Sequence, residues 1–272
     1  PSTTVETIKA AVLALDGLDL AAPGRIGAIG FSFGATQALI AATDPGLRGH
    51  LRAVAAWGGY VDLHRTVRYG FEGSHDLDGT EYWREPDPYG RWILAGNYLT
   101  LLPEHAGDAR LADALLSLAR EAGRAGIMSW DPATDPLKRR IGAGLDDRQR
   151  EMFDLLAPAT DAPWTVADRR RVVDLAGRLS IAASEREPLL DPRPYLDRVP
   201  VPVFLAHGRD DRLMPWTELV RLRRALPPDR VESAAVTSLF SHSFGERRVP
   251  GPSMAVQAIR FIRLIHRMLR LI

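Results

Sequence analysis

The sequence predicts an α/β protein with a mostly parallel sheet flanked by helices. Short apolar runs, typical of strands buried on both faces, alternate with segments in which apolar residues recur at helical spacing. This alternation favours parallel strands joined by helical crossovers. The apolar runs cover residues 25–31, 51–57, 201–206 and 231–239.

The first part of the chain predicts a helix, a strand, a sharp turn, a second helix and a second strand. Residues 2–15 carry apolar side chains at helical spacing behind a Ser-Thr pair that can cap a helix. The Pro23-Gly24 pair then breaks the chain before the first apolar run. The second helix is expected over residues 33–43.

Residues 62–196 differ in character from the sequence around them. Aromatic residues and Pro, Asp and Gly turns fill residues 70–93, and helical patterns follow. We interpret this stretch as an inserted helical unit that divides the main domain into residues 1–61 and 197–272. The helical patterns inside it cover residues 111–122, 146–156 and 166–179.

After the insertion, helices are expected over residues 215–226 and 252–272. One face of the last helix carries four arginines, Arg260, Arg263, Arg267 and Arg270. A basic amphipathic helix can lie on an anionic membrane. We interpret this helix instead as a cover for the sheet, with its arginines in water.

Composition excludes several classes of protein. The 35 basic and 34 acidic residues nearly cancel, and the arginines form no single basic block, so no nucleic-acid partner is expected. The absence of cysteine excludes disulfides and a cysteine nucleophile. No apolar run reaches the length of a membrane span. Motifs for metals, nucleotides and dinucleotides are missing, so no cofactor is expected.

The sharpest chemical signal is the segment GFSFG at residues 30–34. It matches G-x-S-x-G and falls between a predicted strand and a predicted helix, where a nucleophilic serine stands on a strained turn. We expect glycine at both ends because side chains at Gly30 and Gly34 would collide. Ser32 is the candidate nucleophile, and the backbone N–H of Phe33 is a candidate oxyanion donor.

A serine nucleophile needs a base, and the base needs an orienting acid. His242, in the segment FSHSF after the last predicted strand, is the candidate base. The candidate acid lies in HGRDD at residues 207–211, where Asp211 is preferred and Asp210 is the reserve. Either aspartate could instead cap the following helix. His207 is expected to brace this turn rather than react.

With these residues in the order Ser, Asp, His, the chain resembles the α/β-hydrolase family. The matching segments are GFSFG, HGRDD and SHS at 241–243, and the closest likeness is to esterases of the dienelactone-hydrolase or prolyl-oligopeptidase-like branch. The resemblance implies a triad of Ser32, Asp211 and His242 acting on a small-molecule carboxylic ester. It also implies that residues 62–196 form a helical cap.

The resemblance further implies strands before the nucleophile strand, and a loop after one of them that supplies the second oxyanion donor. Only one helix precedes residues 25–31, and no HGG-type segment occurs. We therefore expect an additional N-terminal segment of the same fold, in the same precursor or as a separate chain. Without it, residues 25–31 would form an unpaired sheet edge.

Aromatic residues near the start of the insertion are candidates for a substrate pocket. Trp83, Tyr89 and Trp92 could contact an acyl or aromatic group, or could simply pack within the insertion. Two other functions remain open. The same triad serves amidases, peptidases and acyltransferases, and a hydrolase-like chain can also be a catalytically inactive binding module.

Overall fold

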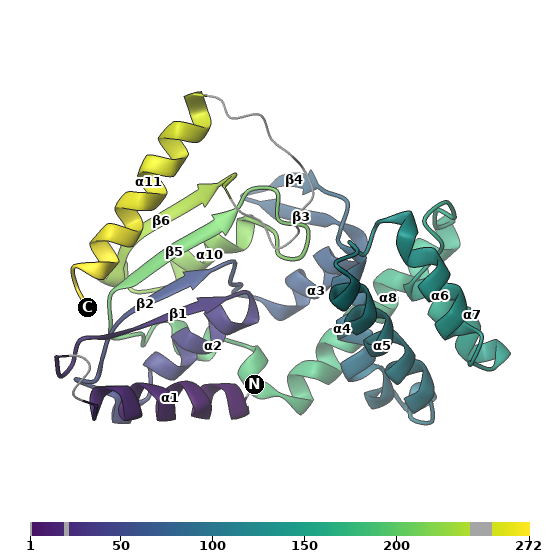
Figure 1. Ribbon diagram of the computed structural model, residues 1–272, viewed down its shortest axis with the longest axis horizontal. Helices are drawn as coiled ribbons and strands as arrows, with labels where there is room; N and C mark the ends of the chain where they lie inside the picture. Colours follow the sequence, from purple (N-terminus) through teal and green to yellow (C-terminus); the bar gives the residue numbers. More distant parts are fainter. Residues whose placement is uncertain (1, 19–21, 240–251) are drawn as a thin grey trace. The chain divides into compact units, whose positions relative to one another are not determined.

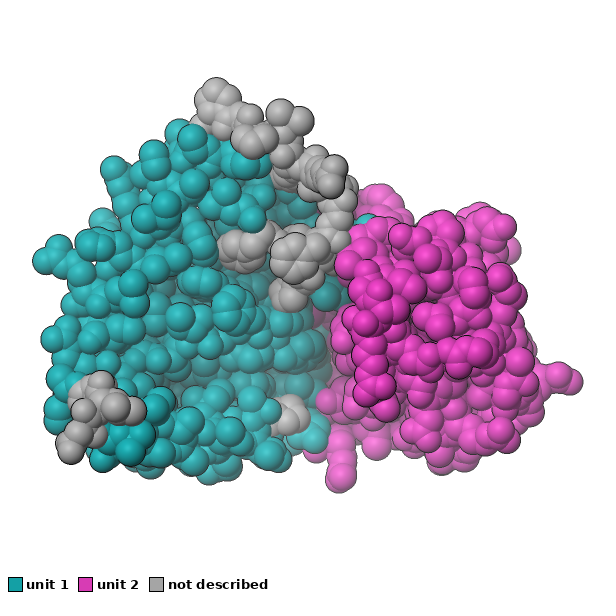
Figure 2. Space-filling model, in the orientation of Figure 1, with its two compact units in different colours: residues 1–63, 187–242, 246–272 teal, residues 64–186, 243–245 magenta. Residues whose placement is uncertain are grey.

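The computed structural model describes residues 2–18, 22–239 and 252–272, which form two compact units (Figures 1 and 2). Of the described residues, unit 1 contains residues 2–18, 22–63, 187–239 and 252–272, and unit 2 contains residues 64–186.

Unit 1 is built on a four-stranded sheet in the order β1-β2-β5-β6, and every neighbouring pair is parallel (Figure 1). The strands are β1 (Ile26–Phe31), β2 (Leu51–Trp57), β5 (Val203–Gly208) and β6 (Val231–Thr237). β1 and β6 are the edge strands of the described sheet. The four apolar runs therefore form one parallel sheet, as the sequence predicts.

Helices cover both faces of this sheet, which explains why its central strands are mostly apolar on both faces. Val54 and Leu205 point into a core shared with the helices on one face, whereas Ala55 and Phe204 pack under the last helix on the other. The helices of the first face are α1 (Ser2–Asp16), α2 (Phe33–Ala42), α9 (Arg193–Leu196) and α10 (Thr217–Ala225). The last helix is α11 (Pro252–Leu269).

Short 3-10 helices join these elements, and each has a proline at its first position, where a missing N–H costs nothing. They are η1 (Pro45–Leu47), η5 (Pro188–Leu190) and η6 (Pro228–Arg230). η5 belongs to unit 1 because its backbone is bound to that unit's core. The side-chain amide of Gln37 donates to the carbonyl of Leu189 at 2.8 Å, and the Tyr60 hydroxyl donates to the carbonyl of Leu190 at 2.7 Å.

Unit 2 is a helical bundle with one small hairpin. α3 (Leu63–Glu72) starts at the boundary. The other helices are α4 (Pro88–Tyr98), α5 (Ala109–Ala125), α6 (Asp135–Gly142), α7 (Asp147–Leu156) and α8 (Val166–Arg186). The 3-10 helices are η2 (Leu99–Leu101), η3 (Pro103–His105) and η4 (Pro132–Thr134). The observed units divide at residues 63/64 and 186/187, so residues 62–63 and 187–196, predicted to belong to the insertion, lie in unit 1.

The hairpin is an element that the sequence analysis did not predict. β3 (Ser74–Leu77) and β4 (Thr80–Trp83) pair antiparallel around Asp78 and Gly79. Both turn residues have positive φ, 52° and 78°, as a two-residue type I′ turn requires. An Asp-Gly pair between two short strands is a strong sequence signal for a hairpin, so Asp78-Gly79 could have predicted this turn.

Unit 2 also contains a buried polar cluster around Asp108, which precedes α5. The Asp108 carboxylate accepts hydrogen bonds from His105 Nδ1 at 2.7 Å, from the Arg148 guanidinium, and from Gln149 Nε2 at 3.4 Å. Burial alone would raise the pKa of this carboxyl, but the hydrogen bonds from His105 and Arg148 hold the pKa below its usual range. The cluster therefore keeps a charge inside the bundle by satisfying its oxygens.

Candidate active site

Ser32 occupies the strained turn that the GFSFG segment predicts. It follows β1 directly and is the N-cap of α2, with φ 56° and ψ −130°. This conformation is rarely adopted by residues other than glycine, and it costs free energy. The Ser32 N–H donates to the carbonyl of Trp57 at 2.9 Å, which ties the turn to the end of β2. The half-buried side chain thus stands at the point where the strand gives way to the helix.

The two glycines of the segment differ in what they do. A Cβ at Gly30 would lie 2.2 Å from the carbonyl oxygen of Gly34 and 2.6 Å from Cα of Ala35, so the predicted collision is confirmed there. A Cβ at Gly34 would meet nothing within 4 Å, so the collision predicted for Gly34 is wrong. The reason is its position in the first turn of α2, where a side chain points into open space.

Phe33 is the first residue of α2, so its N–H has no acceptor within the helix. Helix N-termini carry a partial positive charge, which favours an oxyanion beside Ser32. The Phe33 ring packs edge-on against Tyr60, with ring centroids 5.2 Å apart. This contact fixes the side chain without engaging the backbone donor.

Asp211 is buried, with 3% of its surface exposed, in the turn after β5. Its Oδ1 accepts the backbone N–H groups of Leu213 and Met214, both at 2.9 Å. This turn lies before α10, so Asp211 shapes the local loop and does not cap the helix. Asp210 is only half buried, which favours Asp211 as the acid because a triad acid works away from water.

His207 braces this loop, as the sequence analysis expects. It is fully buried at the end of β5, and its Nε2–H donates to the carbonyl of Met214 at 3.0 Å. The same nitrogen lies 3.6 Å from Oδ2 of Asp211. His207 therefore holds the turn from one side while the Asp211 carboxylate holds it from the other.

The register of the sheet places Ser32 and the Asp211 turn at one edge. Phe31 pairs with Trp57, and Trp57 pairs with Ala206, so the carboxyl ends of β1, β2 and β5 are level. Adjacent strands lie about 4.8 Å apart, so the ends of β1 and β5 are separated by roughly 10 Å. In open α/β sheets, ligands bind at this edge.

His242 lies outside the described residues. The same edge nevertheless includes the end of β6, where Thr237 pairs with Gly208. His242 follows Thr237 by five residues, which extend over at most about 18 Å. Ser32 is three strand spacings from β6, roughly 14 Å, so the length of chain permits His242 to reach it.

The described histidines of unit 1 are poorly placed to be the base. His50 lies just before β2, at the opposite edge of the sheet, and binds Asp16 Oδ2 at 2.6 Å. His207 is committed to Met214. His266 is exposed near the end of α11, and a Cβ at Gly27, near the start of β1, would meet Ile272 at 2.9 Å. The end of α11 therefore lies at the edge away from Ser32.

Unit 2 holds a second serine–histidine pair, which has the wrong chemistry for a nucleophile. Ser180 Oγ lies 2.7 Å from His64 Nδ1, but its hydroxyl donates to the carbonyl of Gly177 at 2.7 Å. His64 must then donate to Ser180 rather than accept its proton. Ser180 is also 1% exposed, so a substrate would not reach it.

The aromatic residues predicted to contact substrate have different environments within unit 2. Trp92 is fully buried, and its indole N–H donates to the carbonyl of Leu156 at 3.2 Å. Its predicted substrate contact is therefore wrong, because the ring forms the core of the bundle. Trp83 is 60% exposed and Tyr89 is 40% exposed, and their contact with substrate stays a prediction.

Among the described residues, no group of three or more His, Cys, Asp or Glu side chains is arranged to hold a metal ion. Within the same residues, every helix is too short or too polar to cross a membrane.

No family model matches the chain, and no curated protein matches it. Among solved structures, an alpha/beta fold family hydrolase from Bacillus anthracis is similar over 98% of this chain and 73% of its own, with 13% identity and a TM-score of 0.43. Acetyl xylan esterase 1 from Thermoanaerobacterium sp. is similar over 97% of this chain and 52% of its own, with 14% identity and a TM-score of 0.35. An acetylester hydrolase from Corynebacterium glutamicum is similar over 97% of this chain and 66% of its own, with 14% identity and a TM-score of 0.37. The chain thus spans about half to three quarters of the length of these proteins.

Proposed function

We propose that this chain is a serine hydrolase of the α/β-hydrolase family that cleaves a carboxylic ester through an acyl-enzyme on Ser32. The observation that carries the proposal is the backbone of Ser32, held at positive φ between a parallel strand and a helix N-terminus. Such a strained conformation persists only where the surrounding structure maintains it, and it is common at active sites. In the proposal, the Ser32 hydroxyl reacts next to the N–H of Phe33, which as the first residue of α2 has no acceptor within the helix.

In the proposed mechanism, His242 takes the proton of Ser32 as Oγ attacks the acyl carbon. The C–O π electrons move to the carbonyl oxygen, and the Phe33 N–H donates a hydrogen bond to this oxyanion. His242 then gives the proton to the departing alcohol, and next activates a water molecule that releases the acid. Asp211, whose Oδ1 is held by its own loop, accepts the Nδ1–H of His242 and fixes the ring.

The second oxyanion donor is part of the same proposal. On the edge strand β1, Ile29 and Phe31 are 53% and 60% exposed. An edge with unpaired backbone and exposed apolar side chains invites another strand. We propose that a further segment of the same fold pairs with β1 and supplies the second donor. Losing such a donor typically costs about 2.7–4 kcal/mol of transition-state stabilisation. Unit 2 is the helical cap domain of this proposal.

The test is covalent labelling with a serine-reactive fluorophosphonate, followed by peptide mapping. Wild type should be labelled on Ser32, and Ser32→Ala should lose both the label and the turnover of p-nitrophenyl esters. Ser180→Ala is the matched control, because Ser180 also lies beside a histidine and should not affect labelling. A label that persists in Ser32→Ala, or is absent from folded wild type, would refute the nucleophile and favour an inactive binding module.

A further inference from the structure

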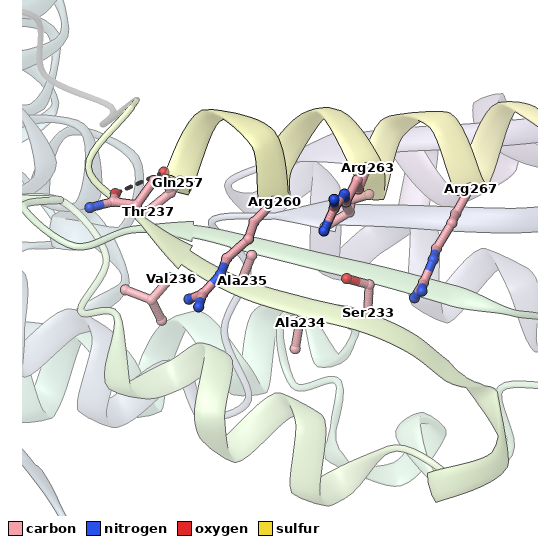
Figure 3. A pocket seen from close by; sticks show the side chains of 10 residues that line it. Ser233, Ala234, Ala235, Val236, Thr237, Gln257, Arg260, Arg263 and Arg267 are labelled. Carbon is pink, nitrogen blue, oxygen red and sulfur yellow. Dashed lines mark hydrogen bonds between the residues drawn. The ribbon is translucent and has the colours of Figure 1, made fainter. Parts of the chain in front are cut away.

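A pocket of about 300 Å³ lies between β6 and α11 in unit 1, away from Ser32 on the far edge strand of the sheet (Figure 3). Its floor is the strand, where the two side chains on the α11 side, Ser233 and Ala235, are small. Its wall is the helix face that carries Arg260, Arg263 and Arg267, whose side chains leave α11 on the side facing β6 (Figure 3). The small floor and the long cationic wall create the hollow.

The charge of the three arginines has no counter-charge among the described residues. None of them forms an ion pair or hydrogen bond with another residue in the part of the chain that the structure describes. Among the described residues, no Asp or Glu lines the pocket. The neighbouring acid on β6, Glu232, is exposed and is not part of the lining. Like charges held together without a counter-ion attract an anion from solution.

The remaining polar groups of the pocket are also arranged as donors. Gln257 Oε1 accepts the backbone N–H of Ser238 at 2.6 Å and is bound by the Thr237 hydroxyl at 3.3 Å. Because a backbone N–H can only donate, this contact fixes the orientation of the amide and leaves the Gln257 NH₂ as a donor. Ser233 adds a hydroxyl to the floor. A lining of guanidinium, amide and hydroxyl donors favours a ligand made of acceptors.

The spacing of the arginines sets the length of the ligand. Residues 260, 263 and 267 are separated by three and four positions, so they lie on one helix face over roughly 10 Å. Figure 3 shows the three guanidinium groups apart from one another along α11, so a ligand that contacts all three as they lie must itself be extended. An arginine guanidinium group can donate two parallel hydrogen bonds to the oxygens of one phosphate. The pocket volume of about 300 Å³ is at the lower end of the range for small-molecule sites. We infer that this pocket binds a small molecule carrying two or more linked phosphate groups.

The test is isothermal titration calorimetry with inorganic pyrophosphate and tripolyphosphate as probes, at constant ionic strength. Wild type should bind one equivalent of probe. Arg267→Gln should weaken binding by about tenfold or more, since charge-assisted hydrogen bonds are lost, and the Arg260, Arg263, Arg267 triple glutamine variant should abolish it. Arg270→Gln is the matched control: it removes the same charge from the same helix, but Arg270 does not line the pocket.

A second variant separates this pocket from general attraction to positive charge. Ser233→Tyr keeps every charge and places a larger, strand-favouring side chain on the floor, so it should block binding. Retained affinity in Ser233→Tyr, or equal losses in Arg267→Gln and Arg270→Gln, would overturn the inference.

The choice of ligand defines the remaining outcomes. Citrate binding as tightly as tripolyphosphate would overturn the assignment to phosphate. Binding of phosphatidic-acid vesicles without any binding of the soluble probes at about 1 mM would assign the arginines to a membrane surface and overturn the small-molecule site. Weak binding of inorganic phosphate together with tight binding of tripolyphosphate would support a ligand with linked phosphates.

Discussion

The strained backbone of Ser32 should make the residue costly for folding as well as necessary for turnover. Its φ of 56° and ψ of −130° suit glycine but not residues with a Cβ, and such a conformation costs about 1–3 kcal/mol. Ser32→Gly removes this cost, whereas Ser32→Ala keeps the Cβ and the strain. Both variants remove the hydroxyl, so they differ only in the backbone effect.

The magnitude follows from two opposing contributions. Glycine relieves the strain but adds about 0.4–1 kcal/mol of conformational entropy to the unfolded chain. Ser32→Gly should therefore be about 1–2 kcal/mol more stable than Ser32→Ala, a difference of about 2–8 °C in Tm. Differential scanning calorimetry on both inactive variants measures it. If Ser32→Gly melts at or below the temperature of Ser32→Ala, the turn is not strained and the reasoning fails.

Three further predictions concern other residues of the fold and the site. Gly30→Ala should lower the free energy of unfolding by about 1–3 kcal/mol, because its Cβ would collide with the backbone of α2. Gly34→Ala should be neutral or slightly stabilising, because its Cβ meets nothing and a helix favours alanine over glycine. Denaturant titration compares the two variants, and equal changes in stability would contradict this geometry. Asp211→Asn should keep the loop bonds to Oδ1 but lower kcat by about 10⁴ through the wrong histidine tautomer, and unchanged kcat would exclude Asp211 as the acid. The lowered pKa of Asp108 means that its carboxylate stabilises the fold above the ordinary aspartate pKa of about 4, and this contribution is lost as the pH falls through the lower folded value. The free energy of unfolding, measured from pH 6 downwards, should therefore fall more steeply for wild type than for Asp108→Asn. Parallel plots of this free energy against pH would show that folding does not stabilise the charged form of Asp108.

The sheet could be predicted from sequence because β1, β2 and β5 are mostly apolar on both faces, whereas its helices are apolar on one face. Residues 51–57 give β2 with both ends as expected, and residues 33–43 give α2 to within one residue. Local sequence predicts such elements, because a parallel strand covered by helices on both faces needs apolar side chains at successive positions. The Ser32 turn was predictable for a related reason: only a few residue types allow a strand to turn sharply into a helix.

Other features depend on contacts that a linear pattern does not contain. Trp92 has the composition of a pocket residue, but its burial and its bond to Leu156 follow from how α4 packs against its neighbours. Gly34 resembles Gly30 in sequence, and only the direction of its missing side chain distinguishes them. The boundary at Glu187 likewise follows from the bonds that Gln37 and Tyr60 make to residues 189 and 190.

The carboxylate of Asp211 is held by amides of its own loop, so its position does not depend on the imidazole ring that it is proposed to orient. If His242 is the base that we propose, the variant His242→Gly would keep both the Ser32 hydroxyl and the Asp211 carboxylate in place around a small void. Free imidazole added to the buffer could occupy this void and restore turnover in proportion to its concentration. Because the Asp211 carboxylate is held by its own loop, the activity of this variant would then depend on the concentration of added imidazole.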